Sequence, residues 1–268
     1  MGWAEYFLGN PSRKDNRYVL LNPLSGGYRM HTPICRGLLI AIFTVSFTVS
    51  NGPVHAGALE DATAAIFRDE YATALRLLRP IAEKGDAAAQ YELGLMFETG
   101  VGVPEDSKEA ARWYLLAAPQ GYASAQHNLA GMYANGQGVN QDFNEAVKWY
   151  RLAAQQGYLS AQLMLGTMYS TGIGGAKDFA EAAKWYRLAA AQGVAGAQST
   201  LGQMYFNGEG VRQDLVLGQM WSILAAAQGN DSAAHTRDIF SKKMTRLQLA
   251  KAKLLAIECE LSKFKRCD

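Results

Sequence analysis

A twelve-residue stretch recurs along the chain and constrains its fold more than any other feature of the sequence. It reads ARWYLLAAPQGY at 111–122, VKWYRLAAQQGY at 147–158 and AKWYRLAAAQGV at 183–194, so that successive copies start 36 residues apart. Self-similarity at such a period indicates a stack of one repeated supersecondary unit, each copy burying the open face of its neighbour. Aligning the chain on itself at this shift gives four full units: 87–122, 123–158, 159–194 and 195–230.

The first half of each unit predicts a helix that ends at a glycine turn. In the first unit Leu93, Met96 and Phe97 follow an Ala-Gln pair, and their spacing places them on one helix face. Gly100 and Gly102 follow, and glycine adopts positive φ without strain, so the helix should stop there. This Gly-x-Gly lacks the preceding strand and the third glycine of a nucleotide-binding loop, which argues against that function.

The second half of each unit predicts another helix, which begins at an aspartate. In the first three units a glutamate stands three residues after this aspartate, as Glu109 follows Asp106. That spacing is typical of an N-cap with a reciprocal carboxylate. A catalytic carboxylate pair is the alternative, but an enzyme needs one such pair whereas a solenoid needs a cap at every helix. The four aspartates are Asp106, Asp142, Asp178 and Asp214.

The recurring tryptophan of the second helix predicts packing between units. A large aromatic residue at constant phase usually packs against neighbouring helices, and a platform for stacking bases or sugars is the alternative. The Gln-Gly at the end of the stretch predicts a left-handed helix cap. The tryptophans are Trp113, Trp149, Trp185 and Trp221, and the capping glycines are Gly121, Gly157, Gly193 and Gly229.

The full pattern, AQ..LG.MY..G.G...D..EA.KWY..AA.QG, resembles the Sel1-like repeat family, a 36-residue relative of the tetratricopeptide repeat. The resemblance implies an all-α, right-handed α-solenoid of antiparallel helix pairs whose first helices line the concave side. We expect an N-terminal capping helix pair over 57–86, and a half-repeat, capping helix and tail over 231–268. A capping box is expected at Thr245 and Gln248.

The fourth unit departs from the others on the outer side of its second helix. Leu217, Met220 and Ile223 stand there in place of charged or polar residues. Apolar side chains on a formerly solvated face need a cover, because terminal units of a solenoid must shield the last apolar surface. We expect the cover to be residues 231–258.

The N-terminal region predicts export. Residues 37–49 form an uncharged apolar run after Arg36, and a small-residue site places signal cleavage after Ala56. The run is shorter than a membrane-spanning helix requires. A signal peptide over 30–56 would start at Met30, with 1–29 untranslated or disordered; a long functional leader or an uncleaved anchor are the alternatives. The expected location is the periplasm, or the extracellular space, with no stable membrane anchor after cleavage.

Charge excludes one class of partner. The chain carries 26 Lys and Arg against 24 Asp and Glu, and removing residues 1–56 takes away five basic and two acidic residues. The remaining 21 basic and 22 acidic residues give about −1. Such a chain has no basic stripe for nucleic acid.

Two cysteines remain in the expected mature chain, Cys259 and Cys267. An even pair in an exported protein suggests a disulfide. Eight positions along one helix would separate them by about 12 Å, which is beyond disulfide reach, so the bond predicts a helix end near Cys259 and a tail that folds back. Two free thiols, or a bond between two copies of the chain, are the alternatives.

The sequence offers few residues for catalysis. His127 and His235 lie three repeats apart and should be too distant to share a metal or a substrate. No metal-spaced Cys/His cluster is present, and no serine stands in a nucleophile-elbow context. Some Sel1-like proteins carry cysteine pairs in each repeat and are connected with β-lactam binding, but this chain lacks those pairs. We therefore expect no enzyme, no cofactor and no metal.

The concave face is the expected functional surface. Its residues are mostly uncharged, which argues against a clamp for acidic peptide C-termini and suits an extended or helical peptide segment. The resemblance implies an adaptor or scaffold that binds a protein partner, with a role in envelope signalling or exopolysaccharide control. The alternatives are a cell-wall-ligand-binding protein or hydrolase, a secreted protein that meets a host, and a surface with no partner of its own. The expected contact residues are Tyr91, Leu95, Glu98, His127, Asn135, Leu163, Thr167, Ser170, Ser199, Gln203 and Phe206.

Overall fold

The computed structural model describes residues 52–267, which belong to one compact unit. The expectations for the start codon and the signal peptide fall on residues 1–51, outside the described residues; the expected cleavage site at Ala56 lies within the first helix. The described helices are α1 (Gly52–Phe67), α2 (Tyr71–Glu83), α3 (Ala87–Thr99), α4 (Ser107–Ala117), η2 (Ala118–Gln120), α5 (Ala123–Asn135), α6 (Phe143–Gln155), α7 (Leu159–Thr171), α8 (Phe179–Ala190), α9 (Ala195–Asn207), α10 (Leu215–Ala227), α11 (Asp231–Ser241) and α12 (Arg246–Leu261).

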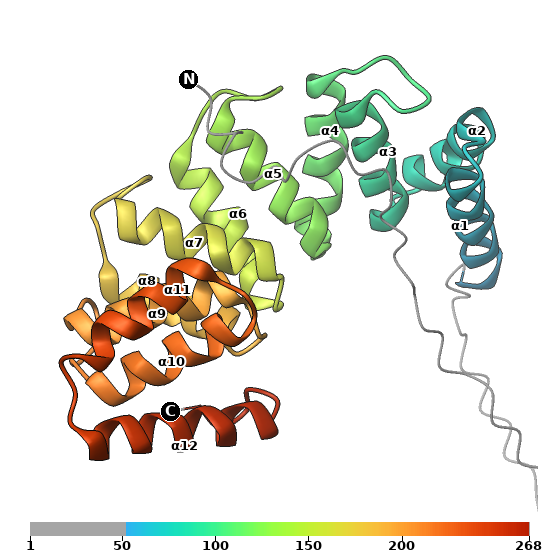
Figure 1. Cartoon of the computed structure of the whole chain (residues 1–268). Coiled ribbons are helices and arrows are strands. Elements are labelled where there is room, and N and C mark those ends of the chain that lie inside the picture. The colour runs from blue at the N-terminus through green and yellow to red at the C-terminus, as the bar shows by residue number, and fades with distance from the viewer. Residues whose placement is uncertain (1–51, 268) are drawn as a thin grey trace, which may run out of the picture. The chain divides into compact units, whose positions relative to one another are not determined.

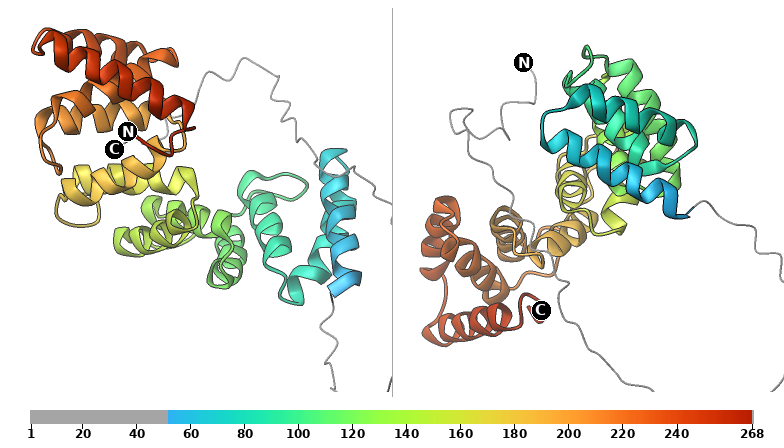
Figure 2. Two further views of the ribbon diagram at one scale, coloured as in Figure 1. Left: turned by 90° about the horizontal axis from the view of Figure 1, so that it is seen from below. Right: turned by 90° about the vertical axis from the view of Figure 1, so that its right-hand side faces the viewer.

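These helices form a solenoid, in which each helix packs chiefly on its neighbours in the sequence. The two helices of each unit contact each other, and the second helix of one unit contacts the first helix of the next. Figures 1 and 2 show the pairs following one another from α1 to α12. No strand occurs within the described part of the chain. The prediction of an all-α solenoid is confirmed.

The second helices begin as predicted, but the role predicted for their glutamates is wrong. Asp106 caps α4 by accepting hydrogen bonds from the backbone N–H of Lys108 and Glu109. Asp142 and Asp214 make the two equivalent bonds, and Asp178 caps α8 through the backbone N–H of Glu181 alone. A reciprocal bond would need the backbone N–H of Asp106, but that group donates to the carbonyl of Phe97 at 2.9 Å. Glu109 pairs instead with Arg112, 2.5 Å away.

One turn glycine is required by a close approach between units. Gly138 has a φ of 68°, and a Cβ atom built there would lie 1.9 Å from the carbonyl oxygen of Ser107, in the preceding unit. No side chain fits in that space. The second glycine of the turn therefore lets the loop of one unit lie against the start of a helix in the unit before it.

The four tryptophans are buried, with relative exposures of 5, 9, 8 and 1% in chain order. Their indole Nε1 atoms are buried and have no hydrogen-bond partner within residues 52–267, so the rings contribute through packing. Beside them, the ring of Tyr114 lies over Gly94, where a Cβ atom would approach it to 2.5 Å. The small residue in the middle of α3 makes room for this tyrosine.

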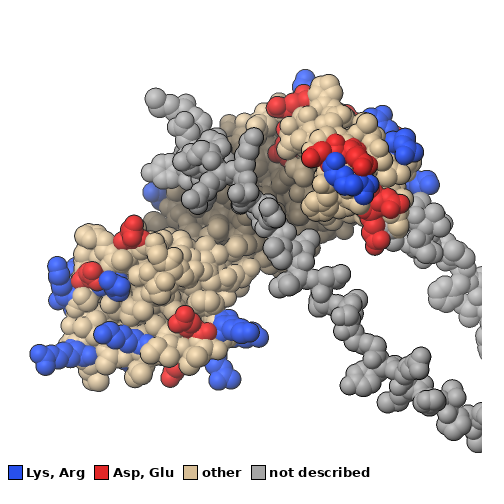
Figure 3. All heavy atoms as spheres, turned by 45° about the vertical axis from the view of Figure 1, so that its right-hand side comes forward, with Lys and Arg blue, Asp and Glu red and all other residues tan. Residues whose placement is uncertain are grey.

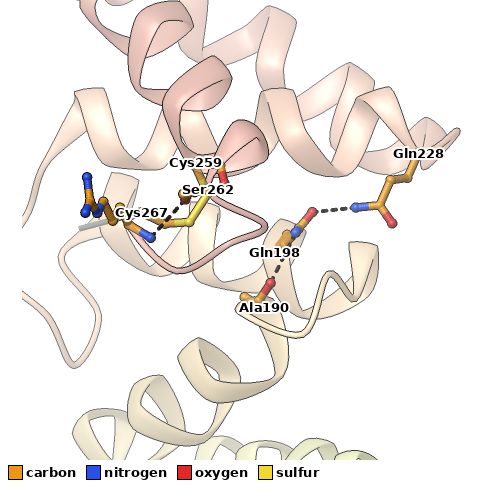
Figure 4. Close-up of a disulfide and its surroundings, with 7 residues drawn as sticks. Ala190, Gln198, Gln228, Cys259, Ser262 and Cys267 are labelled. Carbon is orange, nitrogen blue, oxygen red and sulfur yellow. Dashed lines mark hydrogen bonds between the residues drawn. A yellow bond between two sulfur atoms is a disulfide. The ribbon is translucent and has the colours of Figure 1, made fainter. Parts of the chain in front are cut away.

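A repeated set of glutamine bonds, the glutamine chain, ties each unit to the one before it and joins the two ends of the unit, and it was not predicted from the sequence. Buried Gln198 donates from Nε2 to the carbonyl of Ala190 at 3.2 Å, and its Oε1 accepts a bond from Gln228 at 2.8 Å (Figure 4). The same two bonds recur in every unit. The linked pairs are Gln90 with Gln120, Gln126 with Gln156, Gln162 with Gln192 and Gln198 with Gln228.

The C-terminal helices cover the fourth unit, as predicted. Met220 is fully buried, and Leu217 and Ile223 are partly buried in a cluster that includes residues of α12. Both α11 and α12 pack on α10. The expected capping box at Thr245 is confirmed, since its hydroxyl accepts from the backbone N–H of Gln248 while the Gln248 side chain accepts from the backbone N–H of Thr245.

The tail after α12 folds back on the helix. The backbone N–H of Phe264 donates to the carbonyl of Cys259 at 2.9 Å, and Lys263 and Phe264 have positive φ. The turn brings the Cα atoms of Cys259 and Cys267 to 4.7 Å, with their sulfur atoms joined (Figure 4). Formation of this bond in the cell remains a prediction.

Candidate partner-binding site

All eleven expected contact residues lie on the first helices of the units, α3, α5, α7 and α9. Nine of them are partly or fully exposed. Ser199 and Phe206 are each only 7% exposed, so they do not line an open surface, and the prediction for these two is corrected. Phe206 is covered because Phe240 of α11 stacks on it with a centroid distance of 3.5 Å.

Four half-buried rings on the first two units form what we call the aromatic row: Tyr91, Tyr122, His127 and Tyr158. The rings of Tyr91 and Tyr122 lie 5.0 Å apart, and those of His127 and Tyr158 lie 4.9 Å apart. Each pair combines a residue of a first helix with the residue just before the next first helix. The repeat thus places the same two-ring contact twice, one unit apart.

The aromatic row rests on buried tyrosines of the second helices. Tyr114 packs against Tyr91 at 5.8 Å, and Tyr150 packs against His127 at 5.3 Å. Tyr114 is fully buried and Tyr150 is 3% exposed. These rings belong to the repeated stretch and form the floor on which the row lies.

A hydrogen-bond network fixes one carboxylate beside the row. Tyr114 donates its hydroxyl to Glu98 at 2.5 Å, and the amide of Asn128 donates to the same oxygen of Glu98 at 3.2 Å. Asn128 also donates to the hydroxyl of Tyr114 at 3.0 Å. Only neutral groups donate to this carboxylate, so none of these bonds neutralises its charge.

The surroundings of Tyr91 are negative. Burial, with smaller contributions from Tyr158, Glu92, Tyr122 and Glu98, raises the pKa of Tyr91 to about 12. Burial also raises the pKa of the Glu92 carboxyl above its usual value. The four first helices α3, α5, α7 and α9 contain no Lys or Arg.

His127 is neutral at physiological pH. Burial lowers the pKa of its imidazole to about 4, because removal from water disfavours the charged form. Its Nδ1 atom is buried and has no hydrogen-bond partner among the described residues. The ring therefore serves as an aromatic surface and not as a charged group.

The aromatic row ends after the second unit. At the repeat position of Tyr91 and His127 the later units have Leu163 and Ser199, and at the position of Tyr122 and Tyr158 they have Val194 and Asn230. The residues at the first position were among the expected contact residues, whereas those at the second position, and Glu92, were not predicted. The signal for the second position was an aromatic residue at the last place of the first two units only.

Two hollows of the described surface lie away from the row. One of about 720 Å³ is lined by Lys184, Val211 and Asp214, and another of about 670 Å³ by Lys108, Val139 and Asp142. Their linings occupy equivalent repeat positions, 72 residues apart for Val211 and Val139. They are therefore a product of stacking the units and do not single out a site.

Residues 52–267 offer neither a cluster of metal ligands nor a helix that could span a membrane. No group of three or more His, Cys, Asp or Glu side chains there could hold a metal ion. No helix in this part of the chain has the length and apolar character needed to cross a bilayer. Charged side chains gather towards the two ends of the array, and its uncovered middle is mostly uncharged in the view of Figure 3.

Comparisons with known proteins agree with the repeat. The Sel1 repeat model matches residues 87–122, 123–158, 159–194 and 195–230. A crystallised Sel1 repeat protein from Oxalobacter formigenes is 34% identical, with a TM-score of 0.64 over 67% of this chain and 74% of that one. A protective antigen of uropathogenic Escherichia coli with an SLR fold is 30% identical over 79% of this chain and 55% of its own, with a TM-score of 0.49. No curated protein matches the sequence.

Proposed function

Because the chain belongs to the Sel1 repeat family, whose members generally mediate protein–protein interactions, we propose that it is a non-enzymatic scaffold that binds a segment of another protein. The segment lies along the first helices of the units and is anchored at the aromatic row. The observation that carries this proposal is the row itself, four half-buried rings beside carboxylates that form no ion pair with any residue between 52 and 267.

The chemistry of the row favours a partner segment with a basic residue next to apolar ones. A guanidinium or ammonium group over an aromatic face gains about 0.5 to 2 kcal/mol, depending on its desolvation. Glu92 and Glu98 add negative charge near Tyr91, and no Lys or Arg of the first helices competes for it. The partly exposed Leu95 of α3 and Leu163 of α7 offer apolar contacts on the same first helices.

Selection of binding peptides from a random displayed library on the immobilised full chain tests this proposal. We expect the selected peptides to be enriched in Lys or Arg flanked by apolar residues. They should bind the Glu98→Gln variant at least tenfold more weakly, a loss of about 1.4 kcal/mol of binding free energy or more. Glu145→Gln is the matched control, because Glu145 is an acid of a second helix that already pairs with Lys148. Equal binding by the two variants would show that the row does not provide the charge recognition.

We also propose that the chain works in the periplasm after removal of a signal peptide, in envelope signalling or exopolysaccharide control. The apolar run at 37–49 and the even pair of cysteines support export. N-terminal sequencing of the protein recovered from the periplasmic fraction should begin at Gly57. Recovery of the chain only from the cytoplasm, with its N-terminus intact, would contradict this location.

A further inference from the structure

The outer face of α12 carries an apolar stripe that no other described element covers. Four large side chains are exposed along it: Leu247 at 81%, Leu254 at 61%, Ile257 at 53% and Leu261 at 79%. The opposite side of the helix holds the buried Ala252, Ala256 and Cys259, and α12 packs on α10. Figures 1 and 2 show α12 as the last layer of the stack.

This stripe is unexpected in a capping helix, whose outer face should be polar for solubility. The exposed Ala250 completes a series at 247, 250, 254, 257 and 261. The steps of three and four residues are those of a heptad seam, in which two helices interlock along a line of apolar side chains. The outer face of α12 thus has the spacing of a helix that packs against a second helix.

The charges beside the stripe are distributed in opposite halves of the helix. Lys251 and Lys253 flank it in the N-terminal half, and Glu258 and Glu260 flank it in the C-terminal half. All four are exposed. None of them forms an ion pair with any residue of the described region. Such a helix is complementary to itself when it is turned end to end.

We propose that this face binds a second copy of the chain, through an antiparallel pair of α12 helices related by a two-fold axis. With Leu254 facing Ile257 of the other copy, Ala250 faces Leu261 of the other copy. Lys253 then lies next to Glu260 and Lys251 next to Glu258 of the other copy, and the symmetry repeats each pair. The charges on both sides of the seam are therefore complementary in this register.

Other alignments of the same seam bring like charges together. In a parallel pair the flanking positions would place Arg246 beside Lys251 of the other copy. Sliding the antiparallel pair by one heptad would place Lys251 beside Lys251, or Glu258 beside Glu258, of the two copies. The register with Leu254 on Ile257 is the one in which every close flanking pair is of opposite sign.

The proposed dimer would join two arrays at their C-terminal ends and leave both aromatic rows accessible. It does not depend on the function proposed for the row, because the row lies on the first two units whereas α12 follows the fourth unit. Light scattering on the purified full chain should give a particle of twice the mass of one chain. Leu254→Glu should shift it to the mass of a single chain.

Exchanging charged residues between the two sides of the seam distinguishes this dimer from any other partner that covers the stripe. Lys253→Glu and Glu260→Lys should each weaken the dimer at least tenfold, and the double variant should restore it. The pair Lys253→Glu with Glu258→Lys should not restore it, since it corrects only a parallel arrangement. Lys84→Glu, an equal charge change at the exposed end of α2, is the control and should leave the dimer intact.

These exposed substitutions leave the buried side of α12 unchanged, so circular dichroism should show the wild-type helical content in each variant. A wild-type chain that stays monomeric at all concentrations would overturn the proposal. So would a dimer that is insensitive to Leu254→Glu, or one that the double exchange of 253 and 260 fails to restore.

Discussion

His127 gives the stability of the fold a pH dependence whose sign and size follow from its burial. In the folded chain the pKa of its imidazole is lowered to about 4, whereas in the unfolded chain it should be about 6.5. The unfolded state therefore binds a proton at a higher pH than the folded state, and acidification favours unfolding. The contribution of neutral His127 to the free energy of unfolding is fully present above about pH 6.5 and is lost as the pH falls to about 4.

The magnitude follows from the size of the shift. A difference of one pKa unit corresponds to about 1.4 kcal/mol, so the shift of His127 would amount to about 3 kcal/mol if the site were completely dry. Because the imidazole keeps some contact with solvent, we expect about 2 kcal/mol between pH 7 and pH 4. Glu92 acts in the opposite direction, since burial raises the pKa of its carboxyl.

Urea unfolding of the wild type and of a His127→Leu variant over this pH range measures the effect. The variant is well matched because Leu163 stands at the same repeat position in the third unit. All other groups titrate alike in the two proteins, so the difference in the free energy of unfolding isolates His127. Parallel curves for the two proteins, or an imidazole that titrates near its ordinary pKa by NMR, would refute the reasoning.

Three further changes test how the units are joined. Gly138→Ala should lower the free energy of unfolding by about 3 kcal/mol or more, because its φ and the nearby carbonyl of Ser107 both exclude a side chain. The control Gly121→Ala, which has open space around it, should lower the free energy of unfolding by about 1 kcal/mol. Equal losses in the two variants would contradict the close approach at Gly138. Gln162→Leu should lower the free energy of unfolding in urea by about 1 to 2 kcal/mol, because it removes the bonds to Ala154 and Gln192. Exposed Gln155→Leu should leave it almost unchanged. Equal stabilities of the two variants would show that the glutamine bonds do not stabilise the stack. Reduction of the bond between Cys259 and Cys267 should lower stability by about 2 to 3 kcal/mol, and uptake of two alkyl labels by the unreduced protein would show that the bond is absent.

The architecture was predictable because each structural device recurs at the same phase. Glycines at helix ends, aspartates at helix starts and tryptophans between units are local signals, and four copies of each removed the ambiguity of a single one. The expectation for Glu109 was wrong because it rested on spacing within one helix. The N–H group that Glu109 would need is taken by the carbonyl of Phe97, which lies on the preceding helix.

The site was predictable only in part, because exposure depends on elements outside the repeat. Phe206 occupies the same repeat position as Glu98 but is covered by Phe240 of α11, and no periodic pattern indicates where a terminal helix will pack. The pairing of Tyr91 with Tyr122 depends on a contact between the two ends of one unit. The bonds of the glutamine chain likewise join residues 30 positions apart, such as Gln198 and Gln228.

Photo-crosslinking in living cells tests most directly whether the aromatic row, and not the exposed side of the second helices, binds the partner. A crosslinking amino acid would replace Tyr122 or Tyr158 in the aromatic row, and Leu116 or Leu152 on the exposed side of the second helices. We predict adducts with one defined protein from the two row positions and none from the two control positions. Adducts from Leu116 and Leu152, with none from the row, would contradict the account.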